Sequence, residues 1–279
     1  MKKALSGILL ILIMILTVSP VTSAADMQIQ IDGVTLVSEV KPEIKNSRMM
    51  VPLRVISENL WATVNWSGSD VILKKRDLEV VITLNSNKAA VNGKPVLLDA
   101  KPYLKDNRTF VPLRFIAQAF DCNVMYTNAI ATIKTKPFYI DGVKITAVHE
   151  EFQMTMGSIM AEIKGNAYIE EMYNILKQNK GAEVEAPGNL SPNYRFAEGY
   201  DRTIQVYFVS EKGDYVERFS FYSSILSIGE SEDKRRILMY ADTENKWYTF
   251  TSKAYHEILK LNSITSMYGF QTTISNSTP

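Results

Sequence analysis

Hydrophobic and polar residues alternate over residues 29–37, on both sides of the dipeptide Asp32-Gly33. Alternation with a period of two predicts a half-buried strand, and Asp-Gly is a strong signal for the turn of a β-hairpin. Residues 91–93 repeat the arrangement with the sequence Val-Asn-Gly. Each segment leads into a Lys-Pro pair and a polar turn. We therefore predict two hairpins of the same kind, each followed by the same next element.

That next element begins with the sequence Val-Pro-Leu-Arg, which occurs at residues 51–54 and again, unchanged, 60 positions later at residues 111–114. Sliding residues 31–74 along the chain by that distance needs no gap, which indicates a structural repeat. Proline suits the first turn of a helix, and in both copies apolar residues follow three and seven positions after the leucine of the signature. The signature therefore predicts two short helices, each with one buried face. Its residues are Val51, Pro52, Leu53, Arg54, Val111, Pro112, Leu113 and Arg114.

Beyond each helix the pattern predicts two further strands, so each copy is expected to be strand, strand, helix, strand, strand. Four features occur twice in this part of the chain: the hairpin dipeptide, an arginine shortly before Val-Pro-Leu-Arg, the apolar helix, and an aromatic residue after a valine. This combination resembles the stalk domain, also called the copper amine oxidase N-terminal domain-like family, over residues 27–136. The resemblance implies a small antiparallel sheet wrapped around helices, on an exported and often cell-surface bacterial protein. It also implies a structural or interaction module rather than a catalytic one.

One position departs from the family pattern. The helix of the family tends to run into a glycine, whereas Trp61 and Asp121 occupy the equivalent positions here. Trp61 could present a solvent-facing stacking surface to a sugar ring, and we retain it as a candidate ligand-facing aromatic. The alternative is that it packs against the core, as tryptophans at helix ends more often do.

Charged residues also recur at equivalent positions of the two copies. We predict that each copy closes an arginine–carboxylate ion pair that fixes its helix to a strand, with bidentate geometry. The alternative is a paired acid site for catalysis or ligand binding. A role in the fold is the simpler account, because both copies carry the same set. The candidates are Glu39 and Asp99, Arg48 and Arg108, and Arg54 and Arg114.

A different module is predicted to begin at about Pro137. Residues 140–143 copy residues 31–34 letter for letter, but no third Val-Pro-Leu-Arg follows. We expect an α+β chain, with a separate antiparallel-sheet module and two helices over residues 138–268, and a polar, disordered tail over residues 269–279. The pattern predicts a helix over 169–176, a hairpin from 204–208 to 215–222, another from 236–240 to 247–250, and a helix capped by Ser252.

The first 25 residues have the features of a secretory signal peptide. Lys2 and Lys3 precede an apolar run of about 15 residues, which ends before the small residues 22–25. The run is shorter than the roughly 20 residues of a spanning helix, which favours a cleaved signal peptide. The alternative is an uncleaved membrane anchor. We expect a protein that is secreted or held at the cell surface or envelope. The single cysteine, Cys122, corresponds to Ala62 of the first copy, which predicts a small buried residue rather than a reactive thiol.

The remaining composition argues against several functions. The net charge is +1 with Lys and Arg spread along the chain, so no basic stripe recommends nucleic acid as a partner. The family name suggests an amine oxidase, whose centre has three histidines around copper and a tyrosine within a Thr-x-x-Asn-Tyr-Asp/Glu motif. The chain has two histidines, and Arg195 follows its one Asn-Tyr pair. Methionines 154, 156 and 160 near His149 suit Cu(I), but their spacing fits a half-buried strand better.

The sequence thus predicts no catalytic residue, no cofactor and no metal site. The leading hypothesis is an exported bacterial, non-enzymatic module that binds a cell-wall polymer or another envelope protein. One alternative is a wall-modifying hydrolase whose acids lie in the C-terminal module, for instance among Glu183, Glu185 and Glu198. Another is an extracytoplasmic sensor or inhibitor.

Overall fold

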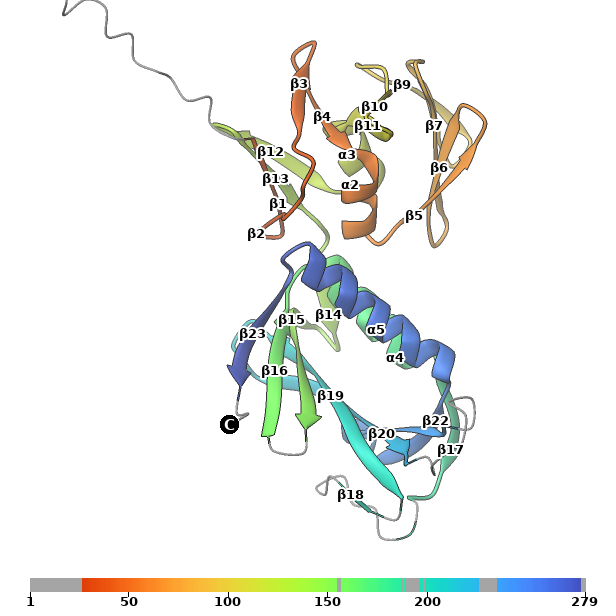
Figure 1. Cartoon of the computed structure of the whole chain (residues 1–279), viewed down its shortest axis with the longest axis vertical. Coiled ribbons are helices and arrows are strands. Elements are labelled where there is room, and N and C mark those ends of the chain that lie inside the picture. The colour runs from red at the N-terminus through yellow and green to blue at the C-terminus, as the bar shows by residue number, and fades with distance from the viewer. Residues whose placement is uncertain are drawn as a thin grey trace, which may run out of the picture.

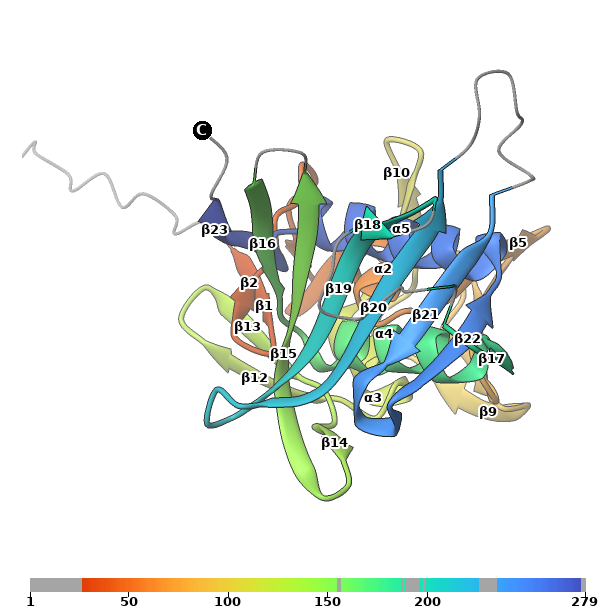
Figure 2. The same cartoon turned by 90° about the horizontal axis from the view of Figure 1, so that it is seen from below.

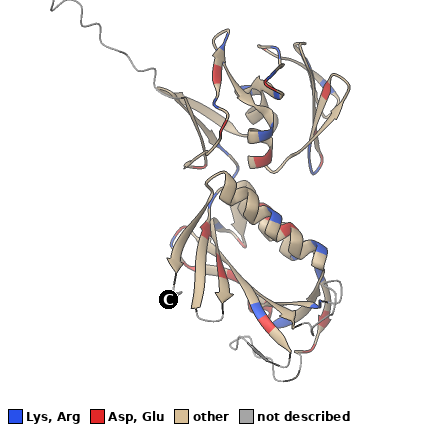
Figure 3. Cartoon of the chain, in the orientation of Figure 1, with Lys and Arg blue, Asp and Glu red and all other residues tan. Residues whose placement is uncertain are grey.

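The computed structural model describes residues 27–154, 157–186, 188, 196–197, 199–225 and 235–276. These residues form a mixed α+β structure that is mostly sheet, with four α-helices and several antiparallel sheets. Figure 1 shows two lobes, which we call the N-terminal lobe (residues 27–136) and the C-terminal lobe (residues 138–276). Charged residues of both signs are spread over both lobes (Figure 3).

The N-terminal lobe holds three small sheets and two helices of seven residues. The strand orders are β12-β13-β1-β2, β10-β11-β4-β3 and β5-β6-β7-β8-β9. The elements are β1 (Gln28–Ile31), β2 (Val34–Thr35), β3 (Glu43–Lys45), β4 (Arg48–Pro52), α2 (Leu53–Asn59), β5 (Thr63–Ser67), β6 (Asp70–Lys75), β7 (Leu78–Thr83), β8 (Lys88–Val91), β9 (Lys94–Leu97), β10 (Tyr103–Lys105), β11 (Arg108–Pro112), α3 (Leu113–Ala119), β12 (Asn123–Thr127) and β13 (Ile130–Lys134).

The two Val-Pro-Leu-Arg segments lie side by side at the centre of this lobe. Strand β4 pairs antiparallel with β11, and Val51 is opposite Val111. The prolines are the extended last residues of these strands, and the helices begin one residue later, at Leu53 and Leu113. Both leucines are buried, as the periodicity predicted. Each signature therefore turns a strand directly into a helix, and the central strand pair fixes the two helices relative to each other.

The C-terminal lobe is built on one large antiparallel sheet. Its strand order is β17-β22-β21-β20-β19-β15-β16-β23, with β14 beside β15 and β18 beside β19. Helices α4 and α5 lie across one face of the curved sheet, next to each other (Figures 1 and 2). The elements are β14 (Phe138–Ile140), β15 (Val143–Met154), β16 (Gly157–Ile163), α4 (Asn166–Gln178), β17 (Lys180–Val184), β18 (Phe196–Ala197), β19 (Tyr200–Ser210), β20 (Tyr215–Ser224), β21 (Ile237–Ala241), the 3-10 turn η2 (Asp242–Glu244), β22 (Lys246–Phe250), α5 (Ser252–Met267) and β23 (Gln271–Asn276).

Two predictions for this lobe need correction. The tail was expected to be disordered, but residues 271–276 form β23 and pair with β16, because the buried ring of Phe270 anchors the chain just before them. The cap of α5 is Thr251 rather than Ser252. The Thr251 hydroxyl accepts a hydrogen bond from the Ala254 N–H at 3.1 Å, so the helix begins at Ser252.

The lobes are joined by polar contacts as well as by packing. The Asp32 carboxylate accepts a hydrogen bond of 2.9 Å from the N–H of Asn166, the first residue of α4. A carboxylate there satisfies a free N–H and complements the positive end of the helix dipole. The Tyr168 hydroxyl donates to Asn59 at 2.7 Å, and one hydrophobic cluster runs through both lobes. The predicted boundary at Pro137 therefore marks a change of sheet without a break in the core.

Candidate binding grooves of the N-terminal lobe

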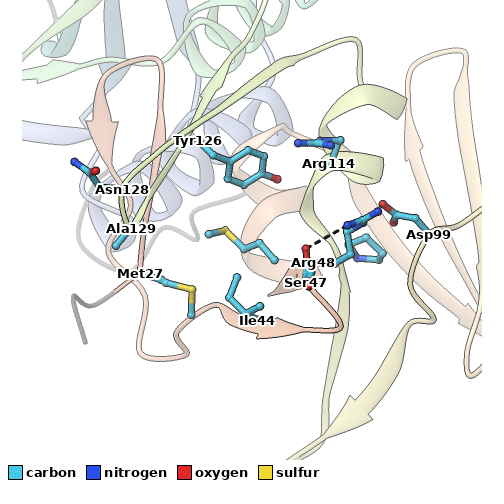
Figure 4. Close-up of a pocket in the computed structure, with 11 residues that line it drawn as sticks. Met27, Ile44, Ser47, Arg48, Asp99, Arg114, Tyr126, Asn128 and Ala129 are labelled. Atoms are coloured by element: carbon cyan, nitrogen blue, oxygen red, sulfur yellow. Dashed lines mark hydrogen bonds and ion pairs between the residues drawn. The ribbon is translucent and has the colours of Figure 1, made fainter. Parts of the chain in front are cut away.

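The first candidate site is a groove of about 520 Å³ that we call groove 1. It lies where the β3–β4 turn, the start of α3 and the β12–β13 turn meet (Figure 4). Its lining residues are Met27, Ile44, Ser47, Arg48, Met49, Asp99, Pro112, Arg114, Tyr126, Asn128 and Ala129. The site thus combines two arginines, one carboxylate and an aromatic ring above an apolar floor.

The two arginines of groove 1 are held in different ways. Arg48 forms an ion pair with Asp99 through Nε and donates to the Ser47 carbonyl at 3.3 Å. Arg114 lies with its guanidinium carbon 5.2 Å from the centre of the Tyr126 ring, and Figure 4 shows both side chains at the groove. A guanidinium beside a ring still has N–H donors to offer to an acceptor at its edge. Arg114 is therefore placed to bind an incoming carboxylate or similar oxyanion.

A second groove, of about 550 Å³, lies where the β10–β11 turn meets the start of α2, and we call it groove 2. There the Arg54 guanidinium carbon is 5.6 Å from the centre of the Trp66 ring, and 49% of Trp66 is exposed. Glu39 and Arg108 also line the groove, but no ion pair joins them. The lining residues are Val37, Ser38, Glu39, Val40, Pro52, Leu53, Arg54, Val55, Trp66, Leu104, Asn107, Arg108, Thr109, Met267 and Tyr268.

The chemistry of the two grooves corresponds position by position. Four residues of groove 1 each have a counterpart in groove 2 at a distance of 60 positions in the sequence. The pairs are Arg48 with Arg108, Asp99 with Glu39, Arg114 with Arg54, and Tyr126 with Trp66. Each groove takes residues from both Val-Pro-Leu-Arg halves of the lobe, because the β4–β11 pair brings the strand of one half beside the helix of the other. The equivalent residues predicted from the sequence are thus collected at two sites.

The predicted ion pairs within one copy are wrong. Asp99 pairs with Arg48 of the other copy, and the arginines of Val-Pro-Leu-Arg lie over aromatic rings rather than against Glu39 or Asp99. These arginines still connect each helix to the strand that follows it in the sequence, through cation–π contacts. Arg54 also forms an ion pair with Glu58, at 3.9 Å, within α2.

Trp61 packs between the lobes, as its alternative interpretation predicted. It is partly buried against the core, and its ring meets the Tyr168 ring edge-on at 6.0 Å between centroids. Its backbone is left-handed, with φ at +57°, and so is that of Asp121. Glycine adopts this conformation without steric cost, which accounts for the family preference at both positions. A tryptophan there is strained.

The metal and thiol predictions concern residues outside the grooves. His149 lies 3.3 Å from Glu162 and 3.4 Å from the Tyr215 hydroxyl, and Met156 is outside the described residues. In the described ranges no three His, Cys, Asp or Glu side chains are grouped so as to hold a metal ion. Cys122 is buried, as predicted, and burial raises the pKa of its thiol to about 11. A thiol with that pKa is a poor nucleophile at neutral pH.

Of the acids proposed for a hydrolase, Glu183 and Glu185 line neither groove. Glu183 lies on the edge strand β17, where its carboxylate accepts a hydrogen bond of 2.7 Å from Lys246. Glu185 is exposed, and Glu198 lies outside the described residues.

A buried acid of the C-terminal lobe escaped the sequence reasoning. Glu150 of β15 is 0% exposed, and its Oε1 accepts a hydrogen bond of 3.0 Å from the Asn262 amide of α5. Glu150 Oε2 and Asn262 Oδ1 are both buried without a partner. Burial raises the pKa of the Glu150 carboxyl to about 7. The available signal was its place in the alternation, since Glu150 lies two residues after the buried Val148 on the same face of the strand.

The comparisons with known proteins identify only the N-terminal lobe. No curated protein and no solved structure matches the chain. None of the described helices is both long and apolar enough to cross a membrane. No family match covers the C-terminal lobe. Residues 30–135, which supply most of both grooves, match the family model of the copper amine oxidase N-terminal domain, and this part of the chain is therefore a domain of the predicted stalk type.

Proposed function

We propose that this chain is an exported, non-enzymatic binding protein of the bacterial envelope, and that its stalk-type domain is the binding module. The family match, the predicted signal peptide and the absence of an amine oxidase residue set in the sequence support this proposal. The partner is a cell-wall polymer or another envelope protein. Its site is the pair of grooves on the N-terminal lobe.

The observation that carries the proposal is the recurrence of an arginine beside an exposed aromatic ring. Arg114 with Tyr126 and Arg54 with Trp66 present the same combination in two separate grooves. The exposed rings offer apolar faces to a sugar ring or an apolar side chain, and the guanidinium edges offer donors to carboxylates. Cell-wall polymers and acidic protein segments both carry these groups. Two similar sites on one rigid lobe would also allow an extended partner to bind both at once.

We further propose that the two halves of the lobe are one duplicated unit. The bounds of β3, β4, α2 and β5 recur 60 residues later in β10, β11, α3 and β12. The antiparallel pairing of β4 with β11 relates the halves by an approximate two-fold axis, and groove 1 is then the counterpart of groove 2. A ligand that binds one groove should therefore bind the other through equivalent residues.

A retention experiment tests the binding role. The chain from residue 27 onward would be applied to purified cell wall and to immobilised membrane-protein extract, beside the double variants Arg114→Ala/Tyr126→Ala and Arg54→Ala/Trp66→Ala. Lys94→Ala on the edge strand β9, away from both grooves, is the matched charge-removal control. We expect retention on one of the two materials, reduced in both double variants and unchanged in the control. Retention on neither material would overturn the binding role, and equal retention of all variants would overturn the assignment to the grooves.

A further inference from the structure

A third cavity, of about 580 Å³, lies where the lobes meet, and we call it the inter-lobe cleft. Helix α2 and strands β5 and β6 line it from the N-terminal lobe, and α4 and α5 line it from the C-terminal lobe. These elements face one another across the boundary between the lobes in Figure 1. The lining residues are Arg54, Glu58, Trp61, Ala62, Thr63, Val64, Lys74, Lys75, Arg76, Glu171, Lys260 and Ile264.

The lining of this cleft carries more positive than negative charge. Five Lys and Arg side chains face two Glu side chains. Three of the cations are paired: Arg54 with Glu58 at 3.9 Å, Lys74 with Glu79 at 2.9 Å, and Arg76 with Glu170 at 2.7 Å. Lys75 and Lys260 form no ion pair with any described residue. These two lysines come from different lobes, so an anion between them would be held by both.

The charged form of Lys75 is disfavoured in this cleft. It is half-buried, and burial lowers the pKa of its ammonium group. The nearby carboxylates of Glu170 and Glu171 oppose this effect, but neither forms an ion pair with Lys75, whereas the neighbouring Lys74 is exposed and paired. An oxyanion bound in the cleft would supply the missing partner.

Trp61 adds a second, independent observation. Its left-handed backbone is strained for a bulky residue, and strain of this kind persists where the surroundings impose it, often at binding sites. Asp121, in the same conformation at the equivalent position, is of a residue type that tolerates it. The Trp61 ring lines the cleft and is fixed from behind by the edge-on ring of Tyr168. The strained residue is thus the one that offers an aromatic surface to the cavity.

We propose that the inter-lobe cleft binds a small organic oxyanion, with its phosphate or carboxylate group between Lys75 and Lys260 and its ring or carbon skeleton against Trp61. This site shares Arg54 with groove 2, but the residues assigned to the anion lie outside both grooves, and the proposal does not rest on the function proposed for them. Because its residues come from both lobes, the bound anion would also hold the lobes together.

Isothermal titration calorimetry of the chain from residue 27 onward tests the site, with glucose 6-phosphate and citrate as the charged probes and glucose as the uncharged one. We expect at least one charged probe to bind, more weakly as salt is added, and glucose not to bind. Lys260→Met, on the exposed face of α5, and Lys75→Met should each weaken binding by about tenfold or more, since each removes a charged hydrogen-bond donor.

Lys74→Met is the matched control, because it removes the same charge from the adjacent, paired position. We expect it to change the affinity less than about threefold. Unfolding curves of the variants establish that each is folded, and Lys260→Met keeps the test decisive if Lys75→Met does not fold. The absence of binding to both charged probes would overturn the proposal. An equal loss in Lys74→Met would also overturn it, by indicating a diffuse positive field rather than a site.

Discussion

Glu150 makes a quantitative prediction about how stability depends on pH. Its Oε1 is bonded to the Asn262 amide, while its Oε2 and the Asn262 carbonyl oxygen are buried with no donor between them. A proton on Oε2 would supply that donor, and it would remove a buried charge that no cation neutralises. The folded protein should therefore favour the protonated acid.

The magnitude follows from the pKa of this carboxyl, which is raised from 4.5 to about 7 in the folded protein. Below pH 4.5 Glu150 is protonated in both the folded and unfolded states, so the stabilisation is fully present. It is lost progressively as the pH rises from 4.5 through 7, because over this range the unfolded state has released its proton while the folded state retains it. Each pKa unit corresponds to about 1.4 kcal/mol, so the free energy of unfolding should fall by about 3 kcal/mol over this window.

Glu150→Gln tests this reasoning, because the amide cannot ionise and can still accept from Asn262. Urea unfolding of the wild type and the variant at pH 5, 6, 7 and 8 gives the difference in unfolding free energy, from which the contributions of other titrating groups cancel. We expect the difference to shift in favour of the variant by about 2.5 kcal/mol between pH 5 and pH 8, because part of the change already lies below pH 5. A constant difference across the series would refute the assignment of a buried, pH-sensitive acid to this position.

Two further substitutions test how the lobes are joined. Asp32→Ala removes the carboxylate that caps α4, and we expect it to lower the free energy of unfolding by about 1–3 kcal/mol. The control is Asp141→Ala, which lies in the same turn sequence but is exposed, and it should lower the free energy of unfolding by less. Trp61→Gly relieves backbone strain but loses the packing against Tyr168, so we expect a net loss of about 1–2 kcal/mol in thermal or urea unfolding, whereas Asp121→Gly should change stability by less than about 0.5 kcal/mol. Equal effects within either pair would contradict the role given to the interface residue.

Periodicity predicted the elements whose partners are close in the sequence. The hairpin of β19 with β20 and the helix α4 follow from apolar spacing, and the starts of α2 and α3 follow from proline. The offset of 60 residues also picked out the six charged residues that line the grooves. Local pattern could do this because these residues face the same way in each copy.

Contacts between distant segments were not predictable in the same way. Nothing in the spacing indicates that β4 pairs with β11, and that pairing decides that Asp99 meets Arg48 rather than Arg108. The polar composition of the tail concealed β23, because a strand at a sheet edge needs only backbone hydrogen bonds and one buried anchor, Phe270. Glu150 was not predicted as a buried acid because its environment depends on α5, more than 100 residues away.

The pairing of the first strand with the last strand of the N-terminal lobe bears on mechanical load. Strand β1 runs parallel to β13, and hydrogen bonds flank it at both ends, from Gln28 N–H to the Ala129 carbonyl and from Asp32 N–H to the Ile133 carbonyl. A pull between the chain before Gln28 and the C-terminal lobe would slide these two strands along each other. The whole row of hydrogen bonds would then be loaded at once instead of opening one by one from an end. A chain tethered by its N-terminus would resist such a force at this junction while the rest of the lobe stayed folded.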